Sequence, residues 1–262
     1  MLIITMAGRF IKPGLETEPD NTSKIVVKYP HKGIIMNYFS FLPKLVLVFC
    51  LPVIFLTASV AIAFNSQWVY QRGFDKYDIE TVTGLEQSEL KKASQELISY
   101  FNSPEELIEI TVVKNGQPFT LFNEREVLHL KDVKDLVELN ATVLVFSSIY
   151  VLGFCAVSLA LRPYDWRRIL RNFIFGSLLA LLAIALIGII ALMDFNWLFL
   201  QFHLLSFSND LWLLDPASDY LIMMFPQGFW ADSALLVAGL TAGGALLTGF
   251  GSYILAYRWK TT

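Results

Sequence analysis

Four apolar stretches, each long enough to cross a lipid bilayer, constrain this chain more than any other feature of its sequence. They run over residues 41–64, 141–161, 173–193 and 234–257. A helix of about 20 apolar residues spans the hydrocarbon core of a bilayer, and only helices and closed barrels satisfy their backbone hydrogen bonds inside it. The residues do not alternate as they would in barrel strands, so the sequence predicts four transmembrane helices.

The composition also indicates a membrane protein. Hydrophobic residues make up 55% of the 262 residues and charged residues 16%, with a mean hydropathy of +0.53. Soluble domains have about 45–50% apolar and about 25% charged residues. Both cysteines, Cys50 and Cys155, lie inside apolar stretches, so no disulfide framework is predicted. The fold class that follows is a mainly α-helical membrane protein.

The distribution of basic residues predicts the orientation of the four helices. Lys and Arg gather in residues 1–40, in the connection 162–172 and in the tail 258–262, whereas the connection 194–233 has neither and carries five aspartates. Short loops rich in Lys and Arg stay in the cytoplasm. We therefore expect a multi-pass cell-membrane protein with both termini in the cytoplasm and with residues 65–140 and 194–233 on the extracellular side.

The first outer segment, residues 65–140, is too long for a structureless loop, and its patterns predict a small extracellular α+β cap. Residues 85–101 have the apolar period of a helix. Two β-rich runs then flank Asn115 and Gly116, a dipeptide that favours the type I′ turn of a hairpin.

A second helix is predicted just after the hairpin, and it carries a histidine. Asn123 and Glu126 have the capping-box spacing of a helix N-terminus, and this helix can continue into the second apolar stretch. His129 has Glu126 three residues before it and Asp132 three residues after it. Either carboxylate is within reach to accept a ring N–H and fix the tautomer. The alternative is an exposed polar pair on a solvated helix face.

The second outer segment places polar residues among leucines and aromatic residues, in the run FHLLSFSNDLWLLDP that starts at Phe202. His203 is the imidazole of this run, and Asn209 and Asp210 follow without an evident capping role. His129 and His203 are two of the three histidines in the chain, and each lies on one of the two outer connections. A single histidine is more often structural, but two at one interface point to a shared site.

The rest of this segment has structural explanations. Asp215 has the position of a helix N-cap, with Pro216 at the first helical position and Asp219 in the first turn. Trp212 and Tyr220 belong to a crowd of aromatic residues, many of which an aromatic belt at the depth of the lipid headgroups explains.

Motifs for other chemistry are weak. A metal site can be drawn from His129, His203 and Asp210, and a catalytic triad from Ser206 or Ser208. The chain has neither HxxxH nor CxxC spacing, however, and no GxSxG motif. It also lacks a P-loop and Rossmann glycines. We therefore expect no metal, no cofactor and no nucleic-acid partner.

Two stretches, EREVLHLKDV (124–133) and FHLLSFSNDLWLLDPASDYLIMMFP (202–226), resemble the lipoprotein intramolecular transacylase family of bacterial membrane proteins. The likeness covers roughly residues 40–257, and the N-terminal tail is longer than is usual in the family. The resemblance implies four membrane helices with an extracellular cap. It also implies two catalytic histidines, one in each motif, which here are His129 and His203.

The resemblance further implies the reaction and the partner. A diacylated bacterial lipoprotein begins with a cysteine that bears an S-linked diacylglycerol and a free α-amine. The family moves the sn-2 acyl chain to that amine, which leaves a lyso-form lipoprotein.

We expect His129 to activate the amine and His203 to protonate the departing oxygen. Asn209, Trp212 or Tyr220 would donate to the developing oxyanion. The other expected supporting residues are Glu126, Asp132, Asp210, Asp215 and Asp219. Membrane lipids are further expected partners, because an aromatic-walled pocket at headgroup depth would hold the acyl chains.

Two other functions remain open. One is a hydrolase of lipids or a metal-dependent peptidase at the outer face, which loss of activity on chelation or release of free fatty acid would reveal. The other is a non-catalytic scaffold or transporter subunit whose cap binds a partner, which tolerance of both histidine substitutions would reveal. Charged residues within the spans would support transport, yet the spans have almost none beyond Lys44.

Overall fold

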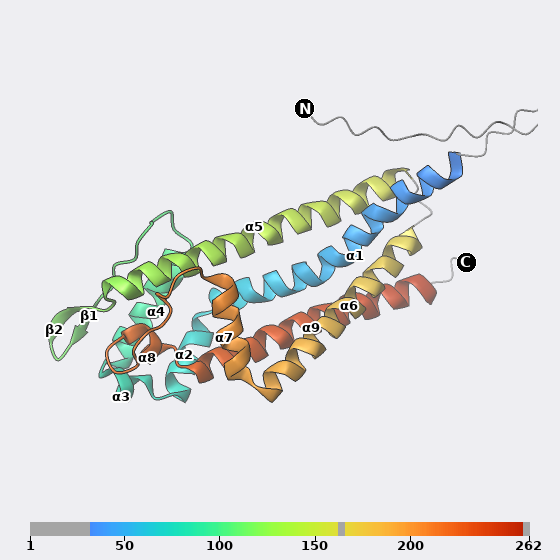
Figure 1. The fold of residues 1–262 in the computed structure, drawn as a ribbon. Coiled ribbons are helices and arrows are strands. Elements are labelled where there is room, and N and C mark those ends of the chain that lie inside the picture. The colour runs from blue at the N-terminus through green and yellow to red at the C-terminus, as the bar shows by residue number, and fades with distance from the viewer. Residues whose placement is uncertain (1–31, 162–165, 259–262) are drawn as a thin grey trace, which may run out of the picture. The chain divides into compact units, whose positions relative to one another are not determined.

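The structure, a computed structural model, describes residues 32–161 and 166–258 (Figure 1). The predicted cytoplasmic tail up to residue 31, part of the predicted cytoplasmic connection and the last four residues lie outside the described residues. The chain divides into two units, Met1–Pro43 and Lys44–Thr262. The second unit contains the cap, both outer connections and almost all of the membrane helices.

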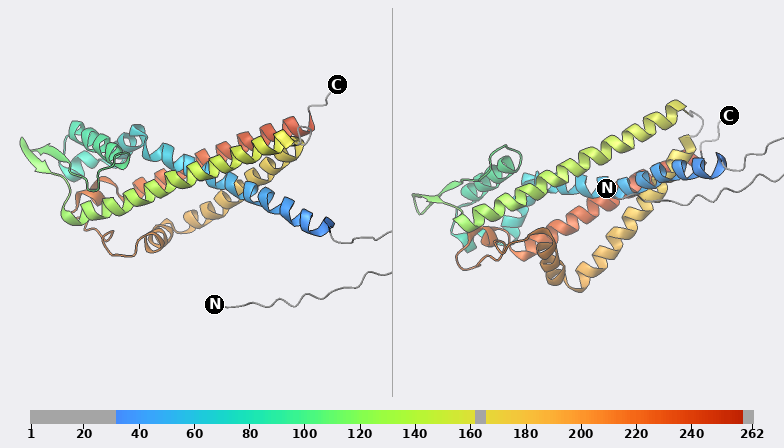
Figure 2. Two further views of the ribbon diagram at one scale, coloured as in Figure 1. Left: turned by 90° about the horizontal axis from the view of Figure 1, so that it is seen from above. Right: turned by 45° about the horizontal axis from the view of Figure 1, so that its top comes forward.

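Four helices are long and apolar enough to cross a membrane, and they confirm the predicted mainly helical membrane fold. They are α1 (Lys32–Phe64), α5 (Glu124–Leu161), α6 (Trp166–Met193) and α9 (Gln227–Tyr257). Helices α6 and α9 run side by side (Figure 1 and Figure 2). A Cβ atom on Gly249 of α9 would lie 2.9 Å from the Cβ of Ser177 on α6, so glycine allows these helices to approach closely.

The first outer segment folds into a small cap at one end of the long helices (Figure 1 and Figure 2). Its elements are α2 (Gln67–Lys76), α3 (Ile79–Thr83), α4 (Gln87–Phe101), β1 (Thr111–Lys114) and β2 (Gln117–Thr120). The second outer segment adds two short helices, α7 (Phe195–Ser206) and α8 (Tyr220–Met224). The predicted α+β composition of the cap is thereby confirmed.

The hairpin of the cap forms where the sequence predicts it. Strands β1 and β2 pair antiparallel, with Thr111 opposite Thr120. Asn115 and Gly116 at its tip have φ values of 53° and 75°. Positive φ at both central residues is what a type I′ turn requires, because this turn matches the right-handed twist of the strands.

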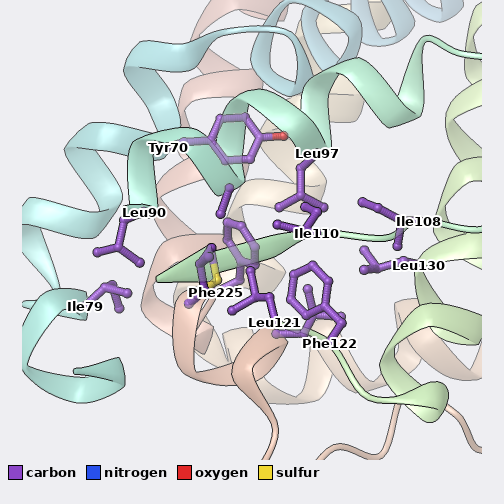
Figure 3. Close-up of a cluster of buried hydrophobic side chains, with 14 of the residues drawn as sticks. Tyr70, Ile79, Leu90, Leu97, Ile108, Ile110, Leu121, Phe122, Leu130 and Phe225 are labelled. Carbon is purple, nitrogen blue, oxygen red and sulfur yellow. The ribbon is translucent and has the colours of Figure 1, made fainter. Parts of the chain in front are cut away.

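The cap has a hydrophobic core of its own, which Figure 3 shows. Leu90 and Leu97, both on the apolar face predicted for residues 85–101, are fully buried in it. Ile110 and Leu121, which flank the hairpin, are buried beside them. Burial of such a side chain stabilises the fold by about 1.5–3 kcal/mol, so the cap is held together mainly by these contacts.

The second outer segment closes this core. Phe225 and Phe229 are 7% and 5% exposed, and both pack against Tyr70 of α2 with centroid distances of 5.9 and 6.2 Å. The backbone of Gly73 lies against the ring of Phe229, where a Cβ atom would clash. The aromatic belt expected for many aromatic residues of this segment therefore does not account for these two phenylalanines, because their rings pack inside the cap.

Helix α5 begins with the predicted capping box and continues without a break to Leu161. The backbone N–H of Asn123 donates to Oε2 of Glu126 over 2.7 Å, and the N–H of Glu126 donates to Oδ1 of Asn123 over 3.1 Å. Two otherwise unpaired N–H groups at the helix start are satisfied in this way. The same helix thus carries His129 in the cap and the second apolar stretch.

The helix that was predicted to start at Pro216 does not form. Residues 216–218 make only a turn, in which Oδ1 of Asp215 accepts the N–H of Ala217 over 2.9 Å. Helix α8 begins at Tyr220, with Asp219 at the N-cap position. Asp215 thus makes the side-chain hydrogen bond of an N-cap, but it caps a single turn and not the predicted helix, and the carboxylate of Asp219 accepts the backbone N–H of Asp215 over 2.8 Å.

Candidate active site

His129 lies in the second turn of α5 and is 7% exposed. The rings of His129 and Phe207 form a T-shaped pair with a centroid distance of 5.0 Å. Nδ1 of His129 is buried and has no hydrogen-bond partner among the described residues. A buried polar atom without a partner is costly, so a polar group of a bound molecule would gain a hydrogen bond here.

His203 lies in the last turn of α7 with its orientation set by the backbone. Its Nδ1 is 2.8 Å from the carbonyl oxygen of Phe199. Because a carbonyl only accepts, Nδ1 carries a hydrogen, and the lone pair of the neutral ring is on Nε2. The rings of Phe199 and Trp212 lie 4.4 and 5.0 Å from the imidazole. Phe202 and Phe207 also contact it.

The two histidines come together although they belong to different outer segments. Their ring centroids are 6.4 Å apart, with an angle of 30° between the planes. Phe207 contacts both rings, at 5.0 and 5.6 Å. At this separation one small polar group can reach both imidazoles, as a pair of proton-transfer groups requires.

Asn209 joins the turn after α7 to α5. Its side-chain Nδ2 donates to Oδ2 of Asp132 over 2.9 Å, and its Oδ1 accepts the N–H of Leu211 over 3.1 Å. Nε1 of Trp212 donates to the carbonyl oxygen of Asn209 over 2.9 Å. Asn209, Asp132 and Trp212 are thus part of one hydrogen-bonded turn beside the histidines.

Glu126 is a buried anchor between the two outer segments. Its side chain is 1% exposed. Oε1 accepts the backbone N–H of Leu221 over 2.6 Å, while Oε2 accepts the N–H of Asn123 in the capping box. Oε1 therefore holds the start of α8 against the start of α5, while Oε2 caps α5 itself. Neither Glu126 nor Asp132 makes a hydrogen bond to Nδ1 of His129 in this structure.

Arg125 also binds the turn after α7, although the sequence interpretation gave it no role. Its guanidinium donates to the backbone carbonyl of Asp210, and its Nε donates to that of Leu211 over 3.4 Å. The carboxylate of Asp210 is 4.0 Å from the guanidinium and its side chain is 81% exposed. The sequence signal for Arg125 is its position one helical turn before His129, on the same face of α5.

Asp215, Asp219 and Tyr220 belong to the contact between the second outer segment and the cap. The buried carboxylate of Asp219 accepts hydrogen bonds from the side-chain amide of Asn123, over 2.9 Å, and from the backbone of Asp215. The hydroxyl of Tyr220 accepts a hydrogen bond from Lys114 of the hairpin. The structure therefore groups these residues with the cap and not with the aromatic rings around His203.

Within residues 32–161 and 166–258, no group of three or more His, Cys, Asp or Glu side chains is arranged to hold a metal ion. The carboxylate of Asp210, one of the three ligands that the sequence allowed, is exposed beside Arg125.

Comparisons with known proteins show the family and the fold of this chain. Residues 45–230 match the family described as lipoprotein intramolecular transacylase Lit. The chain is also 32% identical, over 205 residues, to an uncharacterized protein of Aquifex aeolicus (strain VF5). That match covers 76% of this chain and 87% of the Aquifex protein.

Solved structures of the lipoprotein intramolecular transacylase Lit from Bacillus cereus have a similar fold. One in meso structure has a TM-score of 0.70 at 20% identity and covers 85% of this chain and 97% of that chain. Two variants of the Bacillus protein, in which a histidine is replaced by arginine or by alanine, each have a TM-score of 0.68. At this identity the likeness establishes the fold.

Proposed function

The chain belongs to the lipoprotein intramolecular transacylase family, and on that premise we propose that it moves one acyl chain within a single lipoprotein molecule. The acyl chain leaves the sn-2 oxygen of the diacylglycerol on the N-terminal cysteine and joins the α-amine of the same cysteine. The product is a lyso-form lipoprotein with an N-acyl, S-monoacylglyceryl cysteine. The observation that carries the proposal is the meeting of His129 and His203, whose rings lie 6.4 Å apart.

We assign one proton transfer to each histidine. The α-amine has an ordinary pKa of about 7.7–8.0 and is largely protonated at neutral pH, so it needs a base before it can attack. His129 accepts the proton of the amine. His203, with its ring protonated at both nitrogens, gives the Nε2 proton to the glyceryl oxygen, because its Nδ1–H is bonded to the carbonyl oxygen of Phe199. General acid–base catalysis of this kind contributes about 10²–10⁴-fold for each group.

The bonds and protons of this reaction balance without a further reactant. The amine nitrogen forms a bond to the ester carbon, and the bond from that carbon to the sn-2 oxygen breaks. Counted from the protonated amine, two protons leave the nitrogen: one passes through His129 to the solvent, and the other balances the proton that the departing oxygen takes from His203. Because the amine and the ester belong to one molecule, the protein has chiefly to fold that molecule into a reactive ring.

The aromatic rings around His203 fit a substrate with acyl chains. Phe199, Phe202, Phe207 and Trp212 form apolar walls beside the imidazole. Exclusion of water by such walls favours attack by the amine over hydrolysis. One amide hydrogen of Asn209 is bonded to Asp132, and its second can donate to the developing oxyanion.

We place this site at the extracellular face of the cell membrane. Residues 65–140 and 194–233 are the outer segments in this topology, and both termini are cytoplasmic. The support is the charge distribution, since residues 194–233 carry five aspartates and neither Lys nor Arg. Diacylated lipoproteins and membrane lipids are the partners that this placement implies.

Mass spectrometry of a lipoprotein's N-terminal peptide tests the proposed reaction. Cells that lack other N-acylation activity are compared with and without this protein. We expect an N-acyl, S-monoacylglyceryl cysteine only when the protein is present. A diacylglyceryl cysteine with a free amine in both samples, with the protein verified in the membrane, contradicts the proposal. Release of free fatty acid from the lipoprotein would favour a lipid hydrolase instead.

A further inference from the structure

We propose that Arg125 is a positioning residue. It holds the turn after α7 and so keeps the ring of His203 at its distance from the ring of His129. This inference rests on the proposed function for its consequence in catalysis, but its structural content can be measured separately. Arg125 is not assigned to proton transfer, and its contacts are with backbone atoms of the protein.

The geometry around His129 supports this role. Arg125 is one turn before His129 on α5, and Asp132 is about one turn after it. Arg125 donates to the carbonyl groups of Asp210 and Leu211, and Asp132 accepts from the side chain of Asn209. These two sets of hydrogen bonds, from Arg125 and to Asp132, therefore lie on either side of His129. They hold three consecutive residues of the same turn, 209–211.

The contacts of Arg125 are suited to fixing a backbone. A guanidinium is a planar fork with several N–H donors, so it can bind two neighbouring carbonyl oxygens at once. These two carbonyls belong to an irregular turn, between the end of α7 at Ser206 and the start of α8 at Tyr220. The carboxylate of Asp210, 4.0 Å away and exposed, adds only a weak ion pair.

Helix α7 has no fully buried side chain. It is held to α9 by Asn196, which accepts from Gln227, and by Phe199, which lies against Trp230, so the hydrogen bonds at the turn that follows it add to a small set of contacts. His203 is on this helix, whereas His129 is on α5, which continues into a membrane helix. A misplacement of a catalytic group by about 1 Å can cost on the order of 10²-fold in rate. Loss of the guanidinium is therefore expected to lower the rate while both histidines are retained.

A spin-label distance measures the structural part of the proposal. Cys50 and Cys155 are replaced by serine, and labels are attached at Asp135→Cys on α5 and Ser208→Cys in the turn. We expect one narrow distance distribution in this background and a broadened or shifted one after Arg125→Ala. Arg125→Lys, which keeps a charged donor on a stem of different geometry, should give an intermediate result.

Lys131→Ala is the matched control, because Lys131 is also a basic residue of α5 and pairs with Glu106 of the cap. It should leave the distance distribution unchanged. An unchanged distribution in Arg125→Ala would overturn the positioning role, whatever happens to activity.

Kinetics with a purified diacylated lipoprotein measure the catalytic part. For Arg125→Ala we expect kcat to fall on the order of 10²-fold, with KM changed by less than about threefold, since the guanidinium binds the protein's own backbone. Lys131→Ala should have parental kinetics.

A rise in KM with constant kcat would show that Arg125 binds the substrate and would overturn the inference. Unchanged kinetics with a broadened distance would overturn it as well. If this protein transfers no acyl chain, the proposed function fails. The label distances would still show whether Arg125 holds the turn after α7.

Discussion

The backbone N–H of Leu221 donates to Oε1 of Glu126 over 2.6 Å, and this bond fastens the second outer segment to the first. The carboxylate is 1% exposed and accepts a second backbone N–H, from Asn123. A local capping residue is therefore also a long-range link between the two segments that carry the histidines.

Glu126→Ala should destabilise the protein by about 2–3 kcal/mol, because it leaves two backbone N–H groups without an acceptor. Thermal unfolding in detergent measures this change. Glu126→Gln should cost less, since its amide oxygen still accepts one of the two N–H groups. Glu124→Ala, at an exposed position of the same turn, is the control and should unfold like the parent. Equal unfolding temperatures for Glu126→Ala and Glu124→Ala would show that the link carries no stability.

His129→Ala and His203→Ala should each abolish acyl migration and leave a folded membrane protein. Each removes one proton-transfer group, which contributes about 10²–10⁴-fold. The fraction of N-acylated peptide, measured by mass spectrometry at matched protein levels, is the readout. His31→Ala, in the N-terminal tail, is the control and should behave like the parent. Near-normal formation of the lyso-form by either site variant would refute the assigned role.

Asp219→Ala should cost more stability than Asp215→Ala. The carboxylate of Asp219 is buried and accepts hydrogen bonds from Asn123, from Ser218 and from the backbone of Asp215. Asp215 is exposed, and its side chain accepts one N–H, that of Ala217. We expect losses of about 2–3 kcal/mol and about 1 kcal/mol. Unfolding temperatures in detergent decide the order, and an equal or reversed order would contradict it.

Treatment with a strong chelator should leave acyl transfer unchanged. The proposed mechanism moves protons between two imidazoles and the substrate, and it uses no Lewis acid. A catalytic zinc site has three protein ligands as a rule, and the described residues contain no such group. The yield of N-acylated peptide from purified protein, with and without chelator, is compared. Loss of activity that added metal restores would favour a metal-dependent enzyme.

Much of the fold could be predicted because its causes are local. The membrane helices follow from the length of four apolar runs, and the hairpin turn follows from the backbone freedom of Asn115 and Gly116. The capping box follows from the spacing of Asn123 and Glu126. Each of these features depends on residues that are near one another in the chain.

The contacts between the outer segments could not be predicted in the same way. Glu126 and Asp219 accept hydrogen bonds from distant groups, and Arg125 donates to backbone carbonyls. Every residue has backbone groups, so the sequence does not indicate which of them a side chain will bind. The sequence also does not indicate which aromatic residues of the second outer segment face lipid and which, like Phe225 and Phe229, pack in the cap core, because hydrophobicity alone does not distinguish the two contacts.

The two helices that carry His129 and His203 differ in how firmly the rest of the protein holds them. Helix α5 has no proline from Glu124 to Leu161 and is continuous over that whole range, and sharp helix bends are almost always found at proline or similar interruptions. Helix α7 has no buried side chain. The alignment of the pair is therefore expected to depend on the hydrogen bonds that join Arg125 and Asp132 to the turn after α7, while His129 is the fixed reference point against which the reacting groups are aligned.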